Sequence, residues 1–132
     1  MIRWVLTFGA VLAWIFGAML LFAPGPFFAP IGVAVTDKIA AVAQAQGAIL
    51  VGLGVINFLA RGTVDFTALR AVLVGNLVVQ LLSLGVAVRA LVLGIFPPQG
   101  APSIVIHVVL GALFALALRR VQVGARAAAG SA

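Results

Sequence analysis

Apolar residues along this chain gather into four long blocks, separated by short segments that contain proline, glycine or charged residues. The four blocks are Trp4–Ala23, Ile39–Ala60, Leu69–Leu93 and Ile104–Leu118. In an α-helix, roughly 20 apolar residues at about 1.5 Å each cross a hydrocarbon layer about 30 Å thick. The pattern therefore predicts an all-α membrane protein, a bundle of four transmembrane helices.

The segments between the blocks contain residues that begin and end helices. Thr36 or Asp37 is placed to cap the second helix, because a short acceptor side chain satisfies a free N–H group of the first turn. Asp65 or Thr67 is placed to cap the third helix in the same way. Gly62 follows the second block, which predicts a left-handed C-cap at this position.

Four spans use nearly all of the chain, which has 132 residues and leaves no room for a soluble domain. We expect one transmembrane domain over residues 1–120. The remaining residues, 121–132, are rich in alanine, glycine and arginine and are expected to form a flexible cytoplasmic tail.

Composition excludes a water-soluble fold. Hydrophobic residues make up 65% of the chain and charged residues 8%, and the mean hydropathy is +1.35, whereas a soluble surface needs far more charge. The net charge of +6 would favour nucleic-acid binding in a soluble chain. Here the basic residues mostly flank the blocks, so lipid head groups are the expected partners and nucleic acid is not. The chain has no cysteine, which excludes disulfides and thiolate metal sites, and we expect no metal centre.

The basic residues predict how the chain is oriented. In a four-span arrangement, one side of the membrane receives six arginines: Arg3, Arg61, Arg70, Arg119, Arg120 and Arg126. The opposite side has Lys38 next to Asp37. Since cytoplasmic segments carry the excess of basic residues, this pattern predicts a multi-pass protein of the cell inner membrane with both termini in the cytoplasm.

Small residues recur at intervals of four in three of the blocks, a spacing that lets helices approach closely. We expect intramolecular packing at these positions, with a dimer face as the alternative. The positions are Gly9, Ala13 and Gly17; Ala43 and Gly47; and Gly111 and Ala115.

Polar residues within the second and third blocks are placed to meet along one line, here called the polar seam. Gln46 and Asn57 are eleven residues apart, about 20° in helical projection, so they share a face of the second helix. Asn76 and Gln80 form one stripe of the third helix together with Ser83. The seam serves either for interhelical hydrogen bonding or for binding a polar ligand or water.

A second polar level is predicted toward the outer side of the bilayer, where Gln44, Gln46, Arg89 and His107 have similar depth. Arg89 lies on the side of its helix opposite to Gln80, and it either reaches the lipid head groups or contacts an anion or a quinone carbonyl. His107 either hydrogen-bonds to Gln44 or Gln46, donates to a quinone oxygen, or binds the metal of a tetrapyrrole.

The absence of certain residues excludes several kinds of activity. Both acidic residues, Asp37 and Asp65, fall between the spans, which argues against a proton- or cation-coupled transporter that needs a carboxylate in the membrane. The serines have no nucleophile–base–acid arrangement, and tyrosine is absent. We therefore name no catalytic residue, and catalysis by this chain alone is not expected.

Three stretches of the sequence resemble a group of small bacterial four-helix membrane proteins with no established activity. These stretches are Phe16–Gly25, Ala45–Arg61 and Arg70–Asn76. The chain is also loosely similar to DoxX-type proteins, four-helix chains associated with quinol oxidation or redox complexes. The resemblance implies the four-helix fold rather than a particular reaction.

Together these patterns indicate a protein that acts by binding. It is expected to be an accessory or scaffolding subunit, or a lipid- or quinone-binding module, in contact with membrane lipids and with a membrane-protein partner or further copies of itself. One alternative is a redox- or pigment-associated subunit that uses His107, with a quinone or tetrapyrrole as cofactor. Another is a small oligomeric solute transporter or channel along the polar seam.

The predicted orientation can be tested with reporter fusions at each terminus. We expect both fusions to report a cytoplasmic location, because six arginines flank the spans on that side. A C-terminus on the opposite side would overturn the depth assigned to every polar residue above.

Overall fold

The computed structural model describes residues 1–130, which form four long helices and three short helical turns. The long helices are α1 (Ile2–Phe22), α3 (Asp37–Ala60), α4 (Phe66–Val92) and α5 (Pro102–Gly130). All four are long and apolar enough to cross a membrane. The predicted all-α four-helix bundle is confirmed, and the four spans are those of a multi-pass membrane protein.

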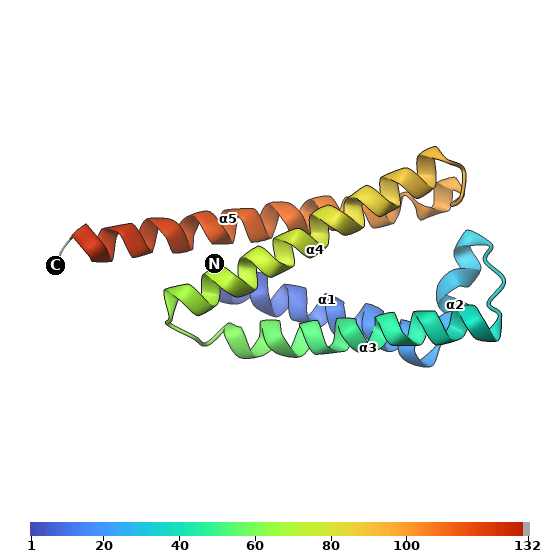
Figure 1. The fold of residues 1–132 in the computed structure, drawn as a ribbon, viewed down its shortest axis with the longest axis horizontal. Coiled ribbons are helices and arrows are strands. Elements are labelled where there is room, and N and C mark those ends of the chain that lie inside the picture. The colour runs from blue at the N-terminus through green and yellow to red at the C-terminus, as the bar shows by residue number, and fades with distance from the viewer. Residues whose placement is uncertain (131–132) are drawn as a thin grey trace.

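The bundle consists of two helix pairs that separate toward one end. α1 packs along α3, and α4 packs along α5, whereas α3 and α4 contact each other only sparsely. Figure 1 shows both chain termini at the end where the pairs converge, and the α4–α5 connection at the end where they diverge. The space between the pairs widens toward that second end.

Short elements cover the diverging end. The proline-rich segment after α1 forms α2 (Pro24–Phe28) and a 3₁₀ turn, η1 (Ala29–Ile31). A second 3₁₀ turn, η2 (Pro98–Gly100), precedes α5. η1 and η2 lie against each other and so connect the two helix pairs across the gap.

The apolar core lies at the converging end and joins α1, α4 and α5. Leu6, Leu73 and Phe114 are its largest fully enclosed apolar side chains. Gly9 of α1 makes room for the Phe114 ring, since a Cβ at this position would lie 2.8 Å from Cζ of that ring. Apolar packing therefore holds the two pairs together at this end.

Glycines bring α1 and α3 into close backbone contact. A Cβ on Gly47 would lie 2.7 Å from the carbonyl oxygen of Gly17 and from the backbone nitrogen of Leu21, and a Cβ on Gly17 would lie 2.9 Å from the carbonyl oxygen of Gly47. Farther along the same interface, Gly54 faces the indole of Trp14. The intramolecular interpretation of the small residues is confirmed at Gly17 and Gly47.

Two of the predicted helix caps are confirmed and one is wrong. The Thr36 hydroxyl accepts a hydrogen bond from the backbone N–H of Ile39, and the Asp65 carboxylate accepts from those of Thr67 and Ala68. Gly62 does not adopt the left-handed conformation; among the described residues only Gly32 and Gly94 have positive φ. α3 ends instead through bonds from Gly62 and Thr63 to the carbonyl groups three residues earlier, which need no left-handed residue.

The segment after residue 120, where a flexible tail is expected, is helical in the described residues, because α5 continues as one helix to Gly130. Val121 is only 2% exposed and belongs to the apolar core. One turn later, a Cβ on Gly124 would lie 3.5 Å from the Phe66 ring of α4. Alanines, which have the highest helix propensity, follow these contacts and continue the helix.

The close approach of α1 and α3 gives a test of the fold. We expect Gly47→Ala to lower the free energy of unfolding by about 1–3 kcal/mol, since its Cβ meets backbone atoms that no side-chain rotation can remove. Gly52→Ala is the matched control, because a Cβ at this position of α3 meets no described atom within 4 Å. Unfolding followed by circular dichroism in mixed micelles measures the free energy of unfolding of both variants. Equal free energies for the two variants would refute the contact.

Candidate functional site

A cavity of about 290 Å³ lies between the two helix pairs, and all four long helices and α2 contribute to its wall. Most of the lining is apolar, with aromatic rings from Phe16, Phe27 and Phe114. The polar residues that line it are Gln46, Asn57, Asn76, Gln80, Ser83, Ser103 and His107. No arginine, lysine or carboxylate is among the described lining residues, so the cavity is suited to an uncharged molecule.

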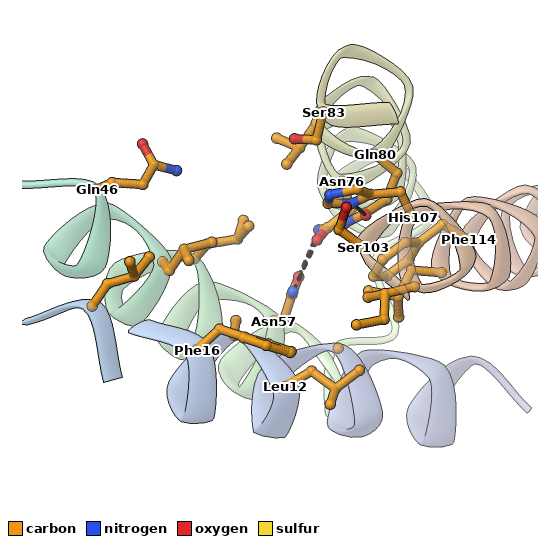
Figure 2. A pocket seen from close by; sticks show the side chains of 18 of the residues that line it. Leu12, Phe16, Gln46, Asn57, Asn76, Gln80, Ser83, Ser103, His107 and Phe114 are labelled. Atoms are coloured by element: carbon orange, nitrogen blue, oxygen red, sulfur yellow. Dashed lines mark hydrogen bonds between the residues drawn. The ribbon is translucent and has the colours of Figure 1, made fainter. Parts of the chain in front are cut away.

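The central polar contact is a reciprocal pair of amides. Asn57 Nδ2 donates to Asn76 Oδ1 at 2.9 Å, and Asn76 Nδ2 donates to Asn57 Oδ1 at 2.6 Å (Figure 2). Asn76 Nδ2 also donates to the backbone oxygen of Val72 at 2.9 Å. Asn57 is 1% exposed and Asn76 2%, so each amide satisfies the other where water is excluded. Of the predicted polar seam, this pair alone links α3 of one helix pair to α4 of the other, and no hydrogen bond joins Gln46 to Gln80.

One turn along α4, Gln80 bonds to a second polar residue. Its Oε1 lies 2.8 Å from His107 Nδ1 of α5. Because an amide oxygen can only accept a hydrogen bond, Nδ1 carries the ring proton in this arrangement and Nε2 presents a lone pair. The expected bond from His107 to Gln44 or Gln46 is therefore wrong. The physical reason is that α5 packs along α4 rather than along α3, which carries both of those glutamines.

Several polar atoms around the cavity keep unused hydrogen-bonding capacity. In the part of the chain that the structure describes, the Gln80 amide nitrogen, His107 Nε2 and the Ser83 hydroxyl have no protein partner. By contrast, the Ser103 hydroxyl donates to the Gly100 carbonyl at 2.7 Å and is already engaged. The cavity thus offers a free donor on Gln80 next to a free acceptor on His107.

The predicted outer polar level is only partly brought together. His107 and Gln46 both line the cavity, but Figure 2 places Gln46 on the other side of it, away from His107. Gln44 and Arg89 are exposed and lie outside the lining. Gln44 is two residues from Gln46, about 200° around the helix, so the two cannot share a face.

Three aromatic residues of the site did not follow from the sequence pattern. Phe27 comes from α2, a helix too short to show a periodic apolar face, and its ring meets that of Phe16 edge to face with centroids 6.2 Å apart. Phe114 could have been recognised as a residue of the inner face of its helix, but not as part of a cavity wall. Apolar periodicity identifies the inward face of a helix and does not distinguish a filled core from a lined cavity.

Side chains of the types that usually bind metal ions do not cluster in this protein's described residues. Among the described residues no group of three or more histidine, cysteine, aspartate or glutamate side chains is close enough to hold an ion.

Comparison with protein-family models, with curated proteins and with solved structures found no match to this chain. The resemblance to small four-helix membrane proteins stays a prediction, and the interpretation of the site depends on its own geometry.

The amide pair can be tested by a double-mutant cycle. We expect Asn57→Leu or Asn76→Leu alone to lower the free energy of unfolding by about 1–2 kcal/mol, because each leaves the partner amide buried without its bond. The double variant should lose about 1 kcal/mol less than the sum of the single losses, since no unpaired amide remains. Exposed Gln44→Leu is the control, and strictly additive effects would contradict the pairing.

Proposed function

We propose that this protein is a quinone-binding module of the membrane, holding the head group of a quinone in the cavity between its helix pairs. The observation that carries the proposal is the lining of this cavity. Its walls are apolar and aromatic, and none of the described lining residues is charged. The Gln80 amide nitrogen is a free donor, and His107 Nε2 is a free acceptor. A quinone ring is flat, apolar and uncharged, and its polar atoms are at its edge. The volume of about 290 Å³ is near the lower end for small-molecule pockets and suits a single ring with its substituents.

Gln80 and His107 have distinct parts in this binding. The Gln80 amide nitrogen donates to a quinone carbonyl oxygen, while its own oxygen holds the proton on His107 Nδ1. His107 Nε2 then accepts from the hydroxyl group of the reduced form, the quinol. Asn57 and Asn76 satisfy each other and so fix the spacing of the helix pairs rather than contact the ligand.

This function agrees with an accessory role in a membrane complex. In such a complex the protein holds the quinone, and a membrane-protein partner or a further copy of the chain exchanges electrons with it. The asymmetry of the arginines supports a location in the cell inner membrane with both termini cytoplasmic.

A second candidate function is the binding of a metal tetrapyrrole through His107. A histidine that ligates a metal usually donates its other ring N–H to an oxygen atom, and Gln80 Oε1 provides that acceptor. A visible absorption spectrum of the gently purified protein separates this candidate from the quinone, because only the tetrapyrrole gives a Soret band.

Quinone binding can be measured by equilibrium dialysis of a short-chain benzoquinone and its quinol in detergent. We expect Gln80→Leu to weaken binding of both forms about tenfold, since one hydrogen bond to a buried group is worth on the order of 1.4 kcal/mol. His107→Phe should weaken binding of the quinol more than that of the quinone, because Nε2 acts only as an acceptor.

Gln44→Leu is the matched control, since Gln44 lies outside the cavity and should leave both affinities unchanged. Wild-type affinity in Gln80→Leu, with its helix content intact by circular dichroism, would overturn the proposal.

A further inference from the structure

A second cleft, of about 300 Å³, lies where the first turns of α4 meet the C-terminal part of α5. It shares no lining residue with the central cavity. Figure 1 places this part of the two helices toward the end of the bundle that holds the chain termini. The lining residues are Phe66, Thr67, Arg70, Val121, Gln122, Ala125 and Arg126.

The cleft exists because α5 extends past the core as a rigid helix. Val121 is buried in the core, and Gly124 lies against the Phe66 ring, so the following turn is held over the start of α4. Gln122 and Arg126 are four residues apart and share a face of α5. Thr67 and Arg70, three residues apart, share a face of α4. Each helix therefore contributes one arginine and one uncharged polar side chain.

No carboxylate balances these two arginines in the cleft. None of the described lining residues is acidic. Asp65, the acidic residue nearest in sequence, caps α4 by accepting from the backbone N–H groups of Thr67 and Ala68 and does not line the cleft. A cleft with two guanidinium groups and no counter-charge lowers the energy of a bound anion.

The position of the cleft indicates which anion is available. α4 has 27 residues, about 40 Å of helix at 1.5 Å per residue, which exceeds the hydrocarbon thickness of about 30 Å and brings its ends to the head groups. Phe66, Val121 and Ala125 are the apolar residues among those that line the cleft. Apolar surface next to paired cations matches a lipid, whose phosphate and acyl chains are adjacent.

We propose that this cleft binds an anionic phospholipid, with Arg70 and Arg126 paired to the phosphodiester oxygens and Thr67 and Gln122 donating to the head group. Arginine suits this role because its planar guanidinium bonds two phosphate oxygens at once. Basic pockets between transmembrane helices are known to bind acidic head groups. The lipid would fix the extended part of α5 against α4.

Native mass spectrometry in mild detergent with added phosphatidylglycerol tests the proposal. The variant Arg70→Gln/Arg126→Gln should lose at least tenfold in phosphatidylglycerol affinity, because each arginine near a head group contributes on the order of fivefold. Arg119→Gln/Arg120→Gln is the matched control; it removes the same amount of charge, from α5 alone, and neither residue lines the cleft. The control should bind within about twofold of wild type.

The outcomes distinguish binding at the cleft from general electrostatic attraction by the arginines. They also distinguish a lipid from a free anion. Equal losses in both double variants, or no loss in either, would overturn the site. Phosphatidylcholine, whose phosphate is balanced by an ammonium group, should bind weakly and equally in all three proteins. Displacement of phosphatidylglycerol by excess inorganic phosphate, with the same dependence on Arg70 and Arg126, would assign the cleft to a free anion and overturn the lipid proposal. Circular dichroism and thermal unfolding confirm that each variant is folded.

Discussion

A buried amide inside a bilayer must find a partner within the protein, because no water is available to it, and this constraint organises the whole bundle. Asn57 and Asn76 satisfy it by bonding to each other across the gap between α3 and α4. The two helices otherwise touch little, so the pair sets how far apart they stand. The volume and the polar edge of the central cavity both depend on that separation.

The contacts within the first helix pair differ in kind from the contacts between the two pairs. Within the first pair, glycines such as Gly17 and Gly47 allow backbone-to-backbone contact, which is how helices associate where lipid is as apolar as the side chains. Between the pairs, large side chains such as Leu73 and Phe114 fill the space at the converging end. Phe114 and Leu110 belong both to this core and to the cavity wall, so the cavity borders the core and no helix is broken there.

The sequence predicts the four spans and the caps at Thr36 and Asp65, since each follows from periodicity or local chemistry within one helix or one turn. The meeting of Asn57 with Asn76 was predicted because the two helices are consecutive in the chain and the two residues have the same depth. The partner of His107 did not follow, because the face of a helix is encoded in its own residues while its neighbour depends on how all four pack. The continuation of α5 past residue 120 was missed for a related reason. Its contacts with Phe66 and with the core are tertiary, and the local composition alone resembles that of a frayed end.

The contact between η1 and η2 affects how a molecule reaches the interior. These turns cover the diverging end, and the helix contacts are sparse between α3 and α4, so a ligand that enters the cavity between these two helices comes from the lipid. A ligand that arrives this way is already dissolved in the bilayer, so occupancy follows its mole fraction among the lipids rather than its aqueous concentration. Modest intrinsic affinity then suffices for a saturated site, because partitioning concentrates a hydrophobic ligand before it meets the protein.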